Sequence, residues 1–140
     1  MSAYKLIRCT LKDKEILIRA LKELGFEPEE FDVPQFLKGY LGDSRKQMAS
    51  IIIPKEQINK LYTKASNDLG FSWNEENQSF DMICSEYDER MNISNIVKQA
   101  YAKCVIEDAL EKQYFSVESN LEELKNKKKI KVQIIGKKFI

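Results

Sequence analysis

The residues best suited to contact a ligand lie in the segment 38–46, where two glycines enclose an aromatic residue and paired cations follow. The backbone amides of such a turn, together with the side chains of Lys38, Arg45 and Lys46, are suited to binding an anion. The alternative, which we favour, is a tight turn with a packed Tyr40 and a solvated basic pair. The segment lacks the spacing of a Walker phosphate-binding loop and the strand that precedes one.

Two other segments place aromatic side chains where a binding site could use them. Trp73 and Asn74 end a run of alternating aromatic and small residues, which would form a stacking platform for a base or a partner chain. The same alternation is typical of strand residues that face a core, and we favour that interpretation. Gly70 would then permit a close backbone approach or a β-bulge. Tyr101 lies on the apolar stripe of a predicted helix, so we expect a core residue whose hydroxyl reaches an edge, with a role in a site as the alternative.

The composition argues against the common catalytic sites. The chain has no histidine, so nucleophilic catalysis of the Ser-His or Cys-His type lacks its usual base. Cys9, Cys84 and Cys104 form no Cys-x-x-Cys pair, and their spacing predicts buried, reduced thiols. We therefore expect no catalytic residue, no metal and no cofactor, and we favour a protein that is not an enzyme. An enzyme that acts on a phosphorylated metabolite without histidine is a third hypothesis.

A basic run closes the sequence, with no acidic residue after Glu123. Its cations are Lys125, Lys127, Lys128, Lys129, Lys131, Lys137 and Lys138. They would bind the phosphates of a nucleic acid, or they would line the solvated face of an edge strand, which we favour. Over the whole chain 23 basic and 22 acidic residues leave a net charge of +1, so no overall field attracts nucleic acid or an anionic membrane.

Length and hydropathy predict a single domain over residues 1–140. With 140 residues, of which 43% are hydrophobic, the chain is long enough for one core. No apolar run approaches the roughly 18 residues that a membrane span needs, and the first residues lack the pattern of a signal peptide. We expect a cytoplasmic protein without a membrane partner.

The periodicity of the apolar residues predicts an α+β fold. A helix between a cap at Asp13 and a glycine stop at Gly25 is the clearest element. Residues 27–42, with two prolines and two glycines, are expected to form an ordered loop. The other predicted elements are strands at 4–10 and 48–53, a short helix after Pro54, a hairpin over 68–85 with its turn at 74–78, a long helix from Asn92 or Ser94, and closing strands at 115–117 and 130–135. This order, β-α-β-(α)-β-β-α-β-β, predicts a mostly antiparallel sheet with two long helices packed on one face.

These segments also carry a family resemblance. The chain resembles the small proteins that plastid and cyanobacterial genomes encode as hypothetical chloroplast frame thirty-five, an uncharacterised conserved bacterial domain. The matching pieces are Leu-Lys-Glu-Leu-Gly at 21–25, Gly-Tyr-Leu-Gly at 39–42, Gly-Phe-Ser-Trp-Asn at 70–74, Phe-Asp-Met-Ile at 80–83 and Gln-Ala-Tyr-Ala at 99–102. The chain departs from the family at Lys103 and Cys104, where relatives tend to have an aromatic residue and a histidine, and in extra length over 54–66.

The resemblance implies the fold and no established activity. Family members resemble accessory proteins often encoded near an ATPase of the AAA class, which implies an adaptor role, and a plastid gene would place the protein in the stroma. Our first hypothesis is therefore a binding or adaptor protein that acts through a protein partner, using the aromatic-rich segment 31–40. The second is a protein that binds nucleic acid or nucleotide phosphates through Lys38, Arg45, Lys46 and the C-terminal lysines.

Overall fold

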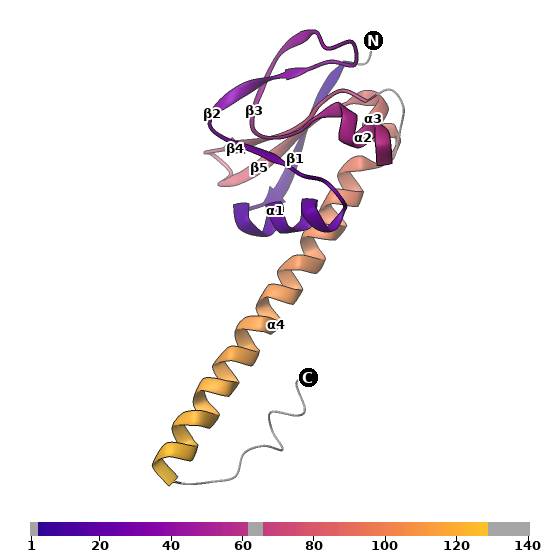
Figure 1. The fold of residues 1–140 in the computed structure, drawn as a ribbon. Coiled ribbons are helices and arrows are strands. Elements are labelled where there is room, and N and C mark those ends of the chain that lie inside the picture. Colours follow the sequence, from indigo (N-terminus) through magenta and orange to yellow (C-terminus); the bar gives the residue numbers. More distant parts are fainter. Residues whose placement is uncertain (1–2, 62–65, 129–140) are drawn as a thin grey trace. The chain divides into compact units, whose positions relative to one another are not determined.

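The computed structural model describes residues 3–61 and 66–128, and the chain divides into two compact units, Met1–Cys104 and Val105–Ile140. The first unit contains a five-stranded sheet in the order β1-β5-β4-β3-β2, in which every neighbouring pair of strands is antiparallel (Figure 1). The strands are β1 (Tyr4–Leu11), β2 (Glu29–Lys38), β3 (Ser44–Ile53), β4 (Leu69–Asn74) and β5 (Ser79–Ser85). The predicted α+β class with a mostly antiparallel sheet is confirmed.

The described residues also form the helices α1 (Lys14–Glu23), α2 (Lys55–Leu61), α3 (Glu86–Arg90) and α4 (Ile93–Lys128), the last of which continues into the second unit. Local signals position α1 as expected. The Asp13 carboxylate accepts a hydrogen bond from the backbone N–H of Ile16 at 3.1 Å, and Gly25 ends the helix with a left-handed φ of 93°. Among the described residues, none of the helices combines the length and the apolar character that a membrane crossing requires.

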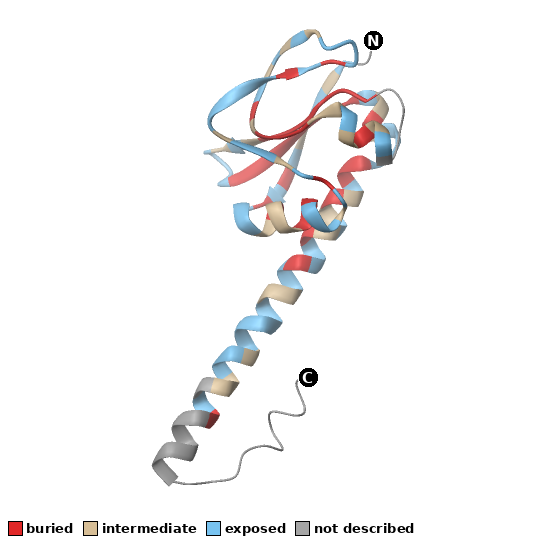
Figure 2. Ribbon diagram, viewed as in Figure 1, coloured by how far each residue is buried: buried red, intermediate tan, exposed pale blue. Residues whose placement is uncertain are grey.

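The main core lies between one face of the sheet and the helices of the first unit. β5 is buried along its whole length, whereas β2 is exposed at most of its positions (Figure 2). The helical residues of this core are Leu17, Ala20 and Leu21 from α1, Ile58 from α2, and Ile93, Val97, Tyr101 and Cys104 from α4. A smaller cluster, to which none of the described helices contributes a residue, is made by Leu37, Ala49, Ile52 and Ile83. The helices therefore pack on one face of the sheet, as predicted.

Gly70 in β4 lets the side chains of Ala49 and Leu37 in the smaller cluster pack close to the β4 backbone. A Cβ atom on this residue would lie 2.8 Å from the Cβ of Ala49 and 2.9 Å from Cδ2 of Leu37, which is closer than carbon atoms pack. The atoms that come close to Gly70 belong to side chains, so the expected close approach of a second backbone is not what this glycine serves. The predicted hairpin over 68–85 is also present, as β4 and β5.

The prediction of an ordered loop over 27–42 is wrong, because β2 occupies most of this segment. β2 pairs with β3 in a register that shifts between Glu30 and Gln35, the interval in which Pro34 lies. A proline has no N–H to donate and is tolerated in an edge strand such as β2. Since both faces of β2 are largely exposed, its residues lack the apolar alternation from which a strand is recognised.

The prediction of a strand at 115–117 is also wrong, because α4 extends through Lys128. Two apolar residues, Phe115 and Val117, are too few to show a period, and the Glu, Lys, Gln and Leu residues around them favour a helix. The long helix begins at Ile93, between the two predicted starting points. The predicted strand at 130–135 lies outside the described residues.

Candidate functional site

The hairpin formed by β2 and β3 contains four of the predicted site residues, namely Lys38, Tyr40, Arg45 and Lys46. Its turn is tight: the N–H of Gly39 donates to the carbonyl of Asp43 at 2.8 Å, and the N–H of Gly42 donates to the carbonyl of Gly39 at 2.9 Å. Gly42 has a φ of 82°, which a residue with a side chain adopts only with strain. The predicted tight turn is confirmed, but the Tyr40 side chain is exposed and not packed.

Arg45 is used within the hairpin and is not a solvated cation. Its Nε donates to Oδ2 of Asp43 at 2.6 Å, and its guanidinium lies 5.6 Å from the ring centroid of Tyr4. The hydrogen bond from Arg45 lowers the pKa of Asp43. Only 17% of the Arg45 side chain is exposed, whereas Lys46 is exposed. Gly39 leaves room for this arginine, because a Cβ there would lie 2.6 Å from Nε of Arg45.

Three consecutive buried polar residues, Ser66, Asn67 and Asp68, hold the hairpin to its neighbours, and we call them the 66–68 bracket. The Asp68 carboxylate accepts one hydrogen bond from the backbone N–H of Lys38 and one from that of Lys55, each at 2.9 Å. Asp68 therefore joins the end of β2 to the first residue of α2, whose N–H has no partner within the helix.

The other two residues of the bracket extend it on both sides. Oδ1 of Asn67 accepts a hydrogen bond from the N–H of Tyr40 at 2.7 Å, which fixes the hairpin turn. Oγ of Ser66 donates to the buried carboxyl of Asp88 in α3 at 2.6 Å. Burial raises the pKa of Asp88, although its hydrogen bonds with Ser66 and Ser85 oppose this effect.

Tyr4 attaches β1 to the same place. Its hydroxyl donates to the carbonyl of Lys38 at 2.9 Å and lies 3.0 Å from the carbonyl oxygen of Asp68. Burial is the largest of the effects that raise the pKa of this hydroxyl, so the tyrosine stays protonated and remains a donor at neutral pH. The base of the hairpin is thus fixed from β1, α2 and the 66–68 bracket.

Beside this anchored base lies a cavity of about 370 Å³, close to the lower end of the range for small-ligand sites. Its apolar lining comes from Phe31, Phe36, Ile52 and Pro54. Its other lining residues are Glu29, Gln35, Lys38, Gly42, Lys55, Glu56 and Asp68. Of the predicted site residues only Lys38 lies in this lining.

The charges around the cavity suit binding better than catalysis. Both carboxylate oxygens of Asp68 accept backbone N–H groups, so this carboxylate already has its partners. Lys55 donates to Glu56 at 2.9 Å, and this hydrogen bond lowers the pKa of Glu56, which stays ionised and is a poor general acid. A cavity lined by both apolar and charged residues can accept an apolar side chain of another molecule and orient it.

The remaining predicted site residues lie apart from the cavity. Trp73 packs edge-on against Phe80, with ring centroids 4.9 Å apart, and the residue is 37% exposed. Asn74 donates to Oδ2 of Asp81 at 3.0 Å. The hydroxyl of Tyr101 accepts hydrogen bonds from the backbone N–H groups of residues 12 and 13, at 3.1 and 2.9 Å. Tyr101 is therefore a core residue whose hydroxyl reaches the start of α1, as expected.

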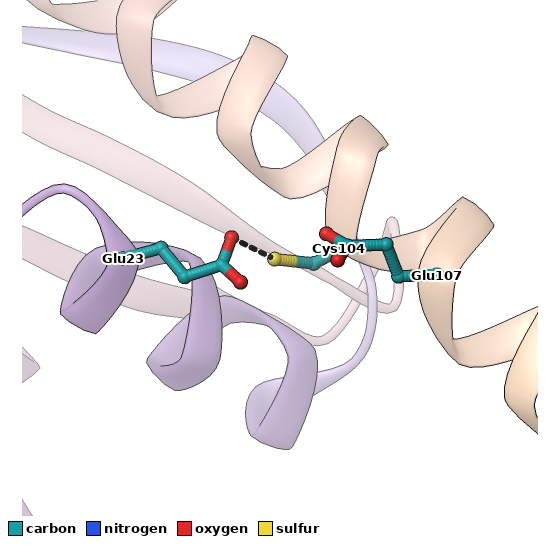
Figure 3. A group of neighbouring side chains, drawn as sticks. All are labelled: Glu23, Cys104 and Glu107. Atoms are coloured by element: carbon teal, nitrogen blue, oxygen red, sulfur yellow. Dashed lines mark hydrogen bonds between the residues drawn. The ribbon is translucent and has the colours of Figure 1, made fainter.

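Cys104, on α4, contacts a carboxylate. Its thiol donates to Oε2 of Glu23 at 3.2 Å (Figure 3). Glu107, drawn in the same figure, follows three positions later on α4 and belongs to the second unit. Glu23 and Cys104 each offer one atom of a kind that can bind a metal ion.

Sequence reasoning missed Tyr4, Lys55 and the 66–68 bracket. The only signal for the bracket in the sequence is its composition. Short polar side chains such as those of Ser, Asn and Asp often form hydrogen bonds with backbone groups. Their partners in β2, α2 and α3 come from distant parts of the sequence and could not be assigned.

Taken together, the chain has an α+β fold in which an edge hairpin is anchored at its base and carries an adjoining cavity. Residues 20–132 match the model of the family described as "Protein of unknown function (DUF1257)", and the chain belongs to that family. The expected relationship to an uncharacterised conserved domain is thereby confirmed. No curated protein and no solved structure matches the chain.

Proposed function

We propose that this protein is a small binding or adaptor protein that acts by docking another protein on its β2–β3 hairpin. The binding face, which we call the hairpin surface, consists of Val33, Phe36, Tyr40, Leu41 and Met48. Its apolar side chains would pack against the partner, and the neighbouring cavity would receive one apolar side chain from it.

The observation that carries this proposal is the concentration of exposed apolar side chains on one hairpin. Among the described residues of the first unit, five of the eight exposed large hydrophobic side chains belong to the hairpin surface. Phe36 is 55% exposed and lies directly across from the exposed Met48 in the β2–β3 register. Exposed apolar residues that cluster on a soluble domain mark interaction sites, whereas scattered ones need no explanation.

The way the hairpin is built also supports docking. The 66–68 bracket and Tyr4 hold its base, so the exposed side chains are presented without a large loss of backbone freedom on binding. β2 is an edge strand, but Pro34 removes an N–H from it, which disfavours the addition of a partner strand. We therefore expect recognition through side chains and the cavity.

The resemblance to plastid and cyanobacterial proteins encoded near an ATPase of the AAA class makes such an ATPase the first partner to test. We place the interaction in the cytoplasm, or in the stroma if the gene is plastid-encoded. Three free cysteines, all buried, are compatible with either reducing compartment.

A second candidate function is the binding of a phosphate-containing ligand or a nucleic acid. It is favoured by Lys38 and Lys55, which both line the cavity. Arg45 contributes less than the sequence suggests, because Asp43 and Tyr4 already contact it. Affinity for RNA or DNA would have to fall steeply with salt concentration, and an absence of binding at low ionic strength would exclude this function.

The docking proposal is tested by affinity purification from source cells with two matched variants. Phe36→Glu places a charge on the hairpin surface, and Leu6→Glu places one on β1 at the opposite edge of the sheet, where the side chain is 57% exposed. We expect a stoichiometric partner with the wild type and with Leu6→Glu, and at least a tenfold loss with Phe36→Glu. Equal recovery with both variants, or no partner with the wild type, would refute the proposal.

A further inference from the structure

β1, the strand at the other edge of the sheet, leaves part of its backbone without a neighbouring strand. Among the described strands it pairs with β5 only. The carbonyl of Ala3 accepts a hydrogen bond from the N–H of Glu86 at 2.9 Å, so residue 3 points to the β5 side. Successive residues of an antiparallel strand point alternately to the two sides. Residues 5 and 7 therefore bond to β5, and the N–H and C=O groups of Tyr4 and Leu6 face the open edge.

This edge is accessible and regular. Leu6 is 57% exposed, and Lys5 and Arg8 are also exposed. The pairing with β5 keeps one register over residues 4–7. β1 contains no proline, so each of its residues has an N–H. A strand edge with free donors and acceptors can add the backbone of another chain.

The charged side chains of β1 and the residue after it are all positive. From residue 3 to residue 12 the chain has the cations Lys5, Arg8 and Lys12 and no acidic residue. All three cations are exposed, and none of them forms an ion pair with another described residue. Their charges are therefore available to a partner.

The acidic residues of the adjoining elements are bonded within the fold or lie at the ends of β1. Asp81 on β5 is buried and accepts a hydrogen bond from Asn74. Asp13 follows the strand and caps α1. The first turn of α3, beside the start of β1, contains Glu86, Asp88 and Glu89. The exposed charges along residues 5–8 are thus positive, and a partner would place its carboxylates there and not beside α3.

We propose that the β1 edge binds an extended acidic segment of another protein, which adds to the five-stranded sheet as a further strand. Such a segment offers N–H and C=O groups to Tyr4 and Leu6, and carboxylates to the neighbouring cations. A phosphate backbone offers acceptors and no donors, so it matches the edge less well than a peptide does. The site is separate from the hairpin surface and does not depend on it.

A second copy of this chain is a poorer occupant of the same edge. Its β1 carries cations only, and like charges opposed across two strands are destabilising. Its β2 is acidic at Glu29, Glu30 and Asp32, but Pro34 has no N–H to contribute to a ladder. The occupant is therefore a segment of a different protein.

Nuclear magnetic resonance with a synthetic peptide of alternating glutamate and valine tests the strand addition. In the free protein the amide protons of Lys5 and Ile7 should exchange slowly with solvent, and those of Tyr4 and Leu6 rapidly. The peptide should slow the exchange at residues 4 and 6. The same peptide with a fully N-methylated backbone has no N–H to donate and should bind more weakly by at least about tenfold. No binding of the first peptide at low ionic strength, or equal binding of the two peptides, would overturn the proposal.

Charge reversal tests the acidic character of the occupant. Lys5→Glu combined with Arg8→Glu should weaken the binding of the glutamate peptide by at least about tenfold and should allow a lysine–valine peptide to bind. Lys60→Glu, at an exposed lysine on α2, is the matched control and should change neither affinity. Circular dichroism checks that the variants fold. Unchanged affinity in the double variant would contradict the proposal. Slowed exchange at residues 4 and 6 caused by an oligonucleotide, or by self-association at high protein concentration, would also contradict it.

Discussion

The Asp68 side chain joins β2 to α2, and its removal tests the account of how the hairpin is held. Its side chain is buried, and its two oxygens accept the N–H groups of Lys38 and Lys55. Asp68→Ala leaves both N–H groups without these acceptors. A hydrogen bond to a charged group contributes about 1.5–3 kcal/mol. Since the two bonds are only partly buried, water replaces some of the loss and the lower value applies to each.

We therefore expect Asp68→Ala to reduce the free energy of unfolding by about 3 kcal/mol. With a urea dependence of about 2 kcal/mol per molar, the unfolding midpoint should fall by about 1.5 M. Asp68→Asn keeps one acceptor oxygen and should lose about half as much. Urea unfolding followed by circular dichroism gives all three values.

Asp32→Ala is the matched control, because Asp32 is an exposed carboxylate on β2, the strand that the bracket holds. Surface substitutions of this kind usually change stability by less than about 0.5 kcal/mol. If Asp68→Ala costs less than about 1 kcal/mol, or Asp32→Ala costs as much as Asp68→Ala, the bracket does not hold the hairpin as described.

Three further predictions concern the first unit. Gly70→Ala should lower the free energy of unfolding by about 1–3 kcal/mol, since the added methyl group would overlap Ala49, and a neutral effect in urea unfolding would contradict the packing described. Tyr101→Phe should cost about 1–3 kcal/mol, because two backbone N–H groups lose their acceptor; an unchanged thermal midpoint would argue against these bonds. Burial raises the pKa of Asp88, so the folded protein holds that proton more tightly than the unfolded chain. The free energy of unfolding should fall as the pH rises from about 4 through the folded-state pKa, and Asp88→Asn should reduce this fall. If the free energy of unfolding depends on pH equally in the variant and the wild type, Asp88 is not the source of the fall.

Elements with local signals could be predicted from the sequence. The N-cap of α1 at Asp13 and its C-terminal stop at Gly25 are adjacent to the helix in the sequence, and both are present in the structure as expected. The β4–β5 hairpin was predictable because its two strands are buried and alternate around a short turn. The position of Tyr101 followed from its place on the stripe of α4, although its particular partners did not.

Elements that depend on distant partners could not be predicted. β2 is recognised as a strand only through its pairing with β3. It has no apolar face, and the residues around Pro34 do not predict a strand. The cavity was missed for the same reason, because β2 provides much of its lining. Residues 115–117 illustrate the opposite error: the alternation of Phe115 and Val117 around Ser116 suggested a strand, although these residues lie within a long helix.

The central claim, that a partner protein docks on the hairpin surface, is tested most directly by site-specific photo-cross-linking in source cells. A benzophenone amino acid replaces Met48 on the hairpin surface or, as a control, Met91 after α3, which is also exposed. The account predicts one discrete cross-linked protein with the probe at position 48, none at position 91, and loss of the product when Phe36→Glu is added. Absence of a product at position 48, or the same product at both positions, would contradict it.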